Sequence, residues 1–162
     1  MSRHVEAGVE QAILVSLRRI IRAVELYSRR LMDEHGLTGP QLATLREIAR
    51  AGGLGGVELA EALQVSQPTI TGIIDRLENR GLVVRSRNGR DRRTVQITVT
   101  EKGRQLADQA PPLLQERFCE EFTKLQKWEQ SMLLANLQRV AAMMNASNLD
   151  ATPHLVSGPE RL

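Results

Sequence analysis

The chain has 162 residues, of which 41% are hydrophobic and 25% charged, a composition typical of a soluble globular protein that excludes disorder throughout. The net charge of +3 comes from 22 basic and 19 acidic residues, which are not evenly scattered. A single cysteine, Cys119, excludes an internal disulfide framework, and the first residues lack the apolar segment of a signal peptide, so we expect a cytoplasmic protein without a membrane span.

The first segment, residues 1–35, is predicted to form a long helix with one apolar side. Apolar residues recur there at alternating steps of four and three for almost three heptads, which is the spacing of a helix that packs against another helix. This stripe consists of Ile13, Leu17, Ile20, Val24, Tyr27 and Leu31. We expect Gly36 to end the helix, because glycine readily adopts the left-handed backbone of a helix C-terminus.

The second segment, residues 36–100, begins with a predicted helix that Thr38 caps and that carries Pro40 in its first turn. The glycine-rich stretch GGLGG, residues 52–56, then interrupts the helical pattern. It lacks the Lys-Ser/Thr pair that follows glycines in a phosphate-binding loop. We therefore interpret it as a flexible turn between helices.

Two helices joined by a tight link are predicted next, over residues 57–63 and from the N-cap Ser66 to Gly81. Ile70, Ile73, Ile74 and Leu77 are spaced as the buried stripe of the second helix. The outer face of its N-terminal half carries small, nearly uncharged residues: Ser66, Gln67, Pro68, Thr69, Thr71 and Gly72. Such a face can approach base edges in a DNA groove, although a plain solvated helix fits this segment equally well by itself.

A cationic hairpin follows directly. GLVVRS, residues 81–86, and TVQITVT, residues 94–100, are predicted strands, and the second places Val95, Ile97 and Val99 on one face. Five arginines lie near the end of the first strand or between the two strands: Arg85, Arg87, Arg90, Arg92 and Arg93. A narrow tip with this positive charge can contact DNA phosphates and enter a minor groove. Asp91 can orient a neighbouring guanidinium through paired hydrogen bonds, and a solvated charged turn is the simpler alternative.

The third segment, residues 101–147, is predicted to form helices that bend at Pro111 and Pro112. Their apolar residues, together with the first helix, exceed what one small lobe can bury, so a second copy of the chain is expected to cover them. The predicted dimer-interface residues are Ile13, Leu17, Ile20, Leu113, Leu114, Phe118, Leu137 and Val140. Residues 148–162 are interpreted as a tail.

The sequence resembles the MarR family of winged-helix transcriptional regulators. DRRTVQITVTEKG, residues 91–103, follows that family's wing pattern, and VSQPTITGIIDRLENRGLV, residues 65–83, follows its recognition helix and first wing strand. The resemblance in organisation spans about residues 10–147. It implies a mainly α fold with a small β-hairpin wing, in which a winged helix-turn-helix lobe is joined to long N- and C-terminal dimerisation helices.

The same resemblance implies a homodimer that binds double-stranded DNA at a palindromic operator and responds to a small-molecule effector. Residues 66–71 would face the major groove, Arg76 would contact a phosphate, and Arg93 would enter the minor groove with Asp91 as its orienting partner; Arg87, Arg90 and Arg92 would add contacts from the wing. Gly72 stands where many relatives carry an arginine. Gly56 stands where a Ser or Thr cap is usual, so the helix after it is expected to be loosely anchored.

Nothing in the sequence indicates an enzyme. The three histidines, His4, His35 and His154, form no metal-ligand spacing, and no nucleophile motif or cofactor site is recognisable. A helical protein-interaction module remains an alternative, but five arginines in nine residues argue against it. A redox-responsive regulator using Cys119 is another, although the adjacent Glu120 and Glu121 disfavour the thiolate that a sensor needs, and a buried apolar role is the simpler interpretation.

Overall fold

The computed structural model describes the backbone of residues 2–87 and 95–149, with side chains from residue 8 onward except that of Arg87. The chain is mainly helical with one small antiparallel sheet, so the predicted fold class is confirmed. The helices are α1 (Ser2–His35), α2 (Gly39–Ala51), α3 (Gly56–Leu63), α4 (Gln67–Asn79), α5 (Glu101–Gln109), α6 (Leu114–Thr123) and α7 (Lys127–Met143). The strands are β1 (Leu54–Gly55), β2 (Val83–Arg87) and β3 (Val95–Val99).

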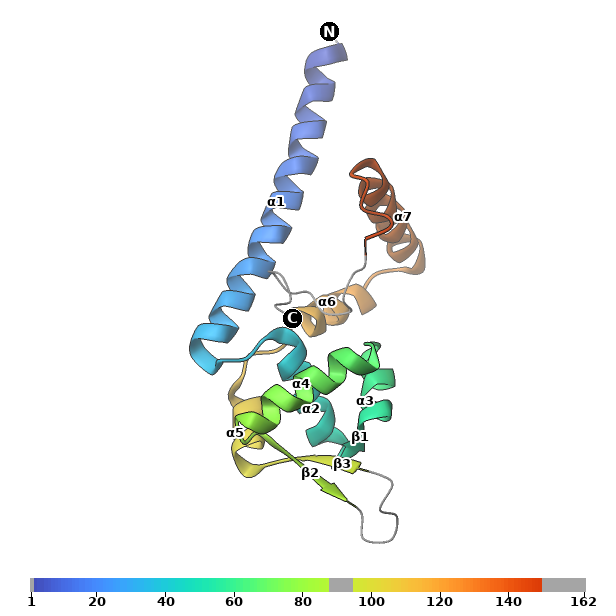
Figure 1. The fold of residues 1–162 in the computed structure, drawn as a ribbon. Helices are drawn as coiled ribbons and strands as arrows, with labels where there is room; N and C mark the ends of the chain where they lie inside the picture. The colour runs from blue at the N-terminus through green and yellow to red at the C-terminus, as the bar shows by residue number, and fades with distance from the viewer. Residues whose placement is uncertain (1, 88–94, 150–162) are drawn as a thin grey trace.

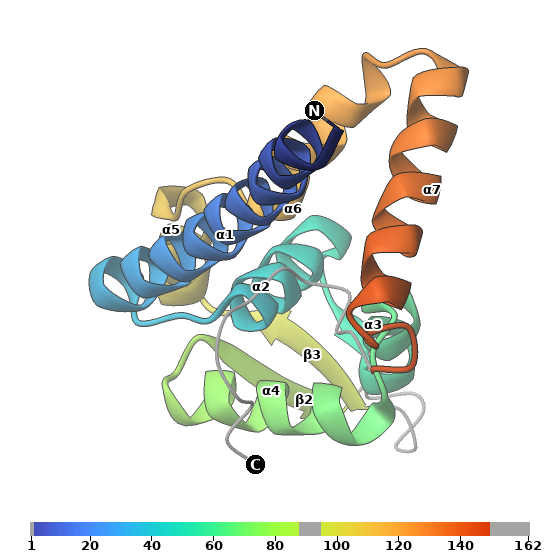
Figure 2. The same cartoon turned by 90° about the horizontal axis from the view of Figure 1, so that it is seen from above.

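The elements separate into a lobe and a pair of projecting ends. Helices α2 to α5 and the three strands form the lobe in the lower part of Figure 1, and α1 rises from it as a long rod. Helix α6 crosses above the lobe and leads to α7. Figures 1 and 2 both show α7 standing apart from α1.

The lobe is built around one apolar core. Its fully buried residues include Leu42, Leu45 and Ile48 of α2, Leu59 of α3, Leu82 just before β2, and Val83, the first residue of β2. The stripe predicted on the second helix of the pair is buried as expected, since Ile70, Ile73, Ile74 and Leu77 all belong to this core. Burial of these apolar side chains is the main force that stabilises the lobe.

Two helix starts in the lobe carry the caps that the sequence predicts. The Thr38 hydroxyl accepts from the backbone N–H of Gln41, whose side-chain oxygen in turn accepts from the Thr38 backbone N–H at 3.0 Å. The Ser66 hydroxyl accepts from the Thr69 backbone N–H at 3.3 Å. These hydrogen bonds satisfy donors that the first turn of a helix leaves unpaired.

The glycine-rich stretch is not the flexible turn that we expected. Leu54 and Gly55 form β1, which pairs with β3 opposite Ile97 and Gln96. Gly55 also caps α3, and its backbone N–H donates to the Glu58 carboxylate at 2.8 Å. The expectation of a loosely anchored α3 is therefore wrong, because a strand pairing and an acidic side chain hold its first turn without a Ser or Thr cap.

The sheet has the order β1-β3-β2, so that β2 is an edge strand. Strands β2 and β3 are antiparallel, with Val83 opposite Val99 and Arg87 opposite Val95. The predicted alternation in β3 holds at its centre, where Ile97 is buried, but Val95 is 37% exposed because it lies at the outer end of the strand, away from the core.

A tight contact joins the hairpin to α5. The Thr100 hydroxyl caps α5 by accepting from the Gly103 backbone N–H at 3.0 Å, and it reaches the Gly81 carbonyl oxygen at 2.8 Å. A Cβ atom on Gly103 would lie 2.1 Å from the Leu82 carbonyl oxygen, well inside contact distance. Only glycine therefore permits this approach of α5 to β2.

The break predicted at Pro111 and Pro112 is present, since α5 ends at Gln109 and α6 begins at Leu114. Leu113, predicted to lie in the dimer interface, is only 9% exposed in the single chain and so offers little surface to a partner. Leu113 is part of the hydrophobic core, because the Pro-containing link turns it back onto the lobe before α6 begins. Leu114 is only half-buried.

Helix α1 belongs partly to the lobe and partly to the projecting end. Leu31 is completely buried and Tyr27 packs against the core, whereas Ile20 near the middle of the helix is 54% exposed. The predicted stripe is thus divided between two surroundings: its last turns are covered by the lobe, and its earlier turns are open. Of the helices that the structure describes, none combines the length and apolarity needed to cross a lipid bilayer.

Candidate nucleic-acid interface

The N-terminal half of α4 presents a small polar surface. Ser66, Gln67, Pro68 and Thr71 are exposed, while Thr69 is half-buried and lies 2.8 Å from the Ser66 hydroxyl, oxygen to oxygen. The Thr71 hydroxyl donates to the Gln67 carbonyl oxygen at 2.9 Å, so its proton is already engaged. A binding partner can approach this surface closely because none of these residues is long and charged.

Gly72 keeps the same surface open. A Cβ atom placed on Gly72 would have no neighbour within 4 Å, so the glycine is not required by packing inside the lobe. Arg76, one turn further along α4, is also exposed. The predicted contact residues of α4 are therefore brought to one accessible side of the helix, opposite the buried stripe.

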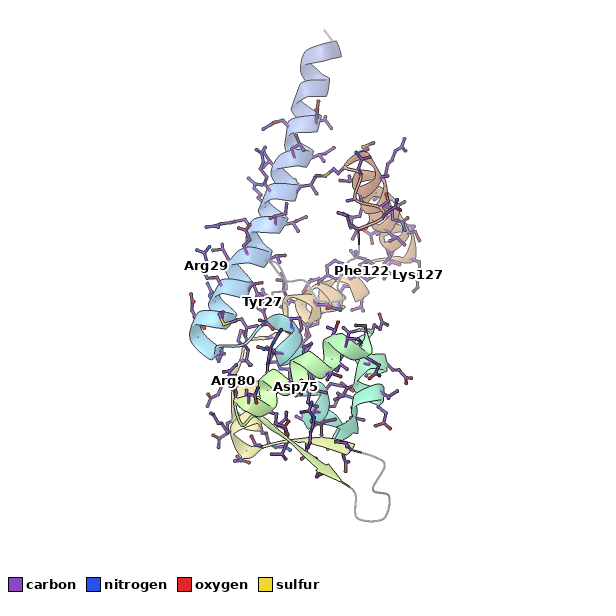
Figure 3. The ribbon with its side chains drawn as sticks, viewed as in Figure 1. Tyr27, Arg29, Asp75, Arg80, Phe122 and Lys127 are labelled. Atoms are coloured by element: carbon purple, nitrogen blue, oxygen red, sulfur yellow. The ribbon has the colours of Figure 1, made fainter. Side chains whose placement is uncertain are left out.

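The C-terminal half of α4 carries two acidic groups that pair with one arginine of the hairpin. The Arg85 guanidinium of β2 forms ion pairs with Asp75, at 2.5 Å, and with Glu78. The hydrogen bond with Asp75, followed by that with Glu78, raises the pKa of Arg85 further above its ordinary value. Asp75 is labelled on α4 in Figure 3. Sequence reasoning counted Arg85 with the arginines of the tip and missed this bond to α4.

Arg80 ties the end of α4 to the end of α1. Its guanidinium donates to the Gly36 carbonyl oxygen at 2.5 Å and to the His35 carbonyl oxygen at 3.4 Å. The Lys102 ammonium donates in turn to the Arg80 carbonyl oxygen at 3.2 Å. Arg80, labelled in Figure 3, thus supplies donors to carbonyl groups that the last turn of α1 leaves unpaired.

The tip of the hairpin lies outside the described residues. Arg90, Asp91, Arg92 and Arg93 fall there, and for Arg87 only the backbone is described, as the last residue of β2. Their roles stay predictions. What the structure does establish is the base of the hairpin, which lies directly beside α4 (Figure 1).

A second polar cluster joins the lobe to the projecting ends. The Arg46 guanidinium of α2 donates to the carbonyl oxygens of Ala107, Ala110 and Pro111 and pairs with the Glu116 carboxylate at 3.0 Å. The nearby Tyr27 hydroxyl is buried with no hydrogen-bond partner within the described part of the chain, and burial raises the pKa of Tyr27. Single-sequence patterns could not reveal this cluster, because its members are up to 70 positions apart.

An open groove of about 420 Å³ lies beside this cluster. Its lining includes Arg46 and Arg50 of α2, Leu63 of α3, and Glu116 and Cys119 of α6. Cys119 is exposed in the single chain, so its interpretation as a buried apolar residue requires a partner chain to cover it. The groove mixes aliphatic and charged side chains.

The surfaces predicted to form a dimer interface are mostly open. Ile13, Ile20, Phe118 and Leu137 are exposed, whereas Leu17 and Val140 are half-buried. The rings of Phe118 and Phe122 stack with centroids 5.4 Å apart and line a groove between α6 and α7 (Phe122 and Lys127 are labelled in Figure 3). Exposed apolar residues in such number are unusual for a monomer.

A short helix, a tight link, a second helix with an open polar face, and a hairpin beside it define a winged helix-turn-helix protein. Comparison with known proteins agrees. A model of the MarR family matches residues 37–95. The chain is 36% identical over 110 residues to the transcriptional regulator HosA of Escherichia coli O111:H-, which covers 68% of this chain and 79% of HosA. The chain belongs to the MarR family of transcriptional regulators, and its lobe is a DNA-binding winged helix.

Two further similarities extend this result. The chain is 31% identical over 91 residues to the HTH-type transcriptional repressor MdtR of Bacillus subtilis strain 168, an alignment that spans 56% of this chain and 59% of MdtR. The crystal structure of the transcriptional regulator BldR from Sulfolobus solfataricus superposes with a TM-score of 0.54 at 26% identity, covering 88% of this chain and 99% of BldR. The likeness to BldR therefore includes the projecting helices as well as the lobe.

Proposed function

We propose that the protein is a homodimeric transcriptional repressor that binds a palindromic operator and leaves it when a small molecule binds. The observation that carries the proposal is the polar N-terminal surface of α4 next to the base of an arginine-rich hairpin. Residues 66–71 would read base edges in the major groove, and Arg76 would contact a phosphate. The similarity to a protein named as a repressor favours repression over activation.

The wing would supply general affinity. In this proposal Arg87, Arg90 and Arg92 contact phosphates and Arg93 enters the minor groove, with Asp91 holding its guanidinium in place. The Asp91→Ala variant distinguishes this orienting role from a purely electrostatic effect of the Asp91 charge. A purely electrostatic wing binds DNA more tightly after Asp91→Ala, whereas loss of the orienting partner weakens binding.

The dimer would form through the open apolar surfaces of α1, α6 and α7. Two lobes related by twofold symmetry require an inverted repeat whose half-sites are centred about one helical turn, or a small multiple of it, apart. The groove between α2 and α6 is our candidate effector site, because a ligand there would touch both the lobe and a dimerisation helix.

Selection of duplexes from a random pool, followed by footprinting, tests the proposal. We expect an inverted repeat protected on both half-sites. Arg92→Ala should weaken binding to all duplexes alike and lower the slope of log affinity against log salt by about one. Gln67→Ala should leave that slope unchanged and lower the preference for the selected site by about 1–3 kcal/mol.

Other outcomes point to the alternatives. Selection that enriches no duplex favours a helical protein-interaction module. Release from the selected duplex by peroxide in the wild type, but not in Cys119→Ser, favours a redox-responsive regulator, for which the exposed thiol of Cys119 is available. Protection of one half-site only would contradict the dimer.

A further inference from the structure

The exposed side of α4 changes character halfway along the helix. Its first half is small and uncharged, but Asp75 and Glu78 follow, and Asp75 is exposed. Unpaired carboxylates on a helix that enters a DNA groove would be repelled by phosphates. Another part of the lobe is therefore expected to pair with the carboxylates of Asp75 and Glu78.

Arg85 of the edge strand β2 provides these pairing groups. Glu78 accepts hydrogen bonds from both the backbone N–H of Arg85, at 3.2 Å, and the Arg85 guanidinium. The other arm of the same guanidinium donates to Asp75 at 2.5 Å. Because β2 is an edge strand, its outward backbone donors have no neighbouring strand, and Glu78 takes the place of one.

The direction of the Arg85 side chain follows from the strand itself. Arg85 shares a face of β2 with Val83, which is completely buried in the core. Alternation along a strand therefore turns Arg85 toward the lobe and α4. With one guanidinium against two carboxylates, the cluster carries a net charge of −1, which does not attract a phosphate.

We propose that Arg85 is a positioning residue for DNA binding: it fixes the wing strand to the recognition helix and offsets part of the negative charge of Asp75 and Glu78, and it does not contact phosphate. This inference rests on the proposed function. A planar guanidinium can bridge two carboxylates on successive helix turns, whereas an ammonium acts as a point charge. Arg85 thus differs in role from the arginines further along the hairpin.

The test uses the full-length protein and a duplex selected by the wild type, with affinity measured at several salt concentrations. Arg85→Ala should weaken binding about tenfold, with the salt slope lowered by much less than the one unit expected for a lost phosphate contact. Arg85→Lys should lose nearly as much, because a lysine cannot bridge both acids. Arg104→Ala, which removes an exposed positive charge from α5, is the matched control and should bind as the wild type does.

A mutant cycle makes the test independent of any loss of stability. In the Asp75→Asn, Glu78→Gln background, adding Arg85→Ala should change affinity less than twofold, because the partners are already gone. A direct phosphate contact gives the opposite pattern. Arg85→Lys then binds almost normally, Arg85→Ala lowers the salt slope by about one, and its effect persists in the double-mutant background.

Any one of these three results would overturn the positioning role while leaving the proposed function intact. Wild-type protein that binds no duplex would overturn both. Urea unfolding of each variant shows whether it remains folded under the binding conditions, so an unfolded Arg85→Ala variant is replaced by Arg85→Lys in the cycle.

Discussion

The lobe and the projecting helices differ in how far their apolar residues are buried. Helix α2 is 13 residues long and buries seven of them, whereas α6 and α7, with 10 and 17 residues, contain no buried residue within this chain. The lobe is therefore a self-sufficient unit whose core needs no partner. The projecting helices leave most of their apolar side chains uncovered by the other residues that the structure describes.

This difference has a thermodynamic consequence. Stability of the lobe should be a property of one chain and hence independent of protein concentration. In the proposed dimer, stability of the projecting helices should depend on association, because the second copy would remove their apolar surface from water.

The largest expected effect lies in the core of the lobe. Leu45→Ala removes a completely buried side chain and leaves a cavity, so it should lower the free energy of unfolding by about 2–5 kcal/mol. Urea denaturation followed by circular dichroism at two protein concentrations measures this, and the loss should be the same at both. Leu134→Ala on α7 is the control, and an equally large loss at low concentration would contradict the distinction.

Placing a charge on the open surface of α7 should dissociate the proposed dimer. Leu137→Glu would bury an unpaired carboxylate in the interface, at a cost of about 2 kcal/mol or more, which corresponds to about a 30-fold rise in the dissociation constant. Light scattering should then report a mass nearer one chain of 18.1 kDa. Gln138→Glu adds the same charge at the next position and should remain dimeric; a monomeric wild type would refute the interface.

Arg46 connects the two regions, and its removal should destabilise their junction. Arg46→Ala leaves the carbonyl oxygens of Ala110 and Pro111 without this donor and the Glu116 carboxylate without its ion pair, which should cost about 2 kcal/mol of unfolding free energy. Urea denaturation measures the loss. Arg50→Ala removes an exposed arginine paired only along α2 and should stay close to the wild type. Equal effects would show that Arg46 does not join the regions.

The smallest effect is expected at the cap of α4. Ser66→Ala removes the acceptor for the Thr69 backbone N–H and should lower the free energy of unfolding by about 1 kcal/mol, independent of protein concentration. Ser66→Asn keeps a capping oxygen and should recover most of that loss. If the asparagine variant is as unstable as the alanine variant, the hydroxyl stabilises the lobe by a route other than capping.

Local patterns in the sequence predicted much of this molecule. The caps at Thr38 and Ser66, the buried stripe of α4 and the break at the two prolines all depend on residues within a few positions of one another, so spacing alone reveals them. The motif ending at Gly103 pointed to the family. Its physical reason, the close approach of Leu82, becomes visible only when α5 and β2 lie side by side.

Other features were decided by tertiary structure alone. A two-residue strand such as β1 has no periodicity to detect, and it exists because β3 offers it a free edge. The heptad stripe of α1 is uniform in sequence, yet Leu31 is buried and Ile20 open, because the lobe covers only one end of the helix. The bonds of Arg85 to α4 and of Arg46 to α6 depend on how elements distant along the chain pack. Sequence by itself determined the local elements and their charge, and packing determined which charges turn inward, because burial and ion pairing depend on distances that the linear order does not contain.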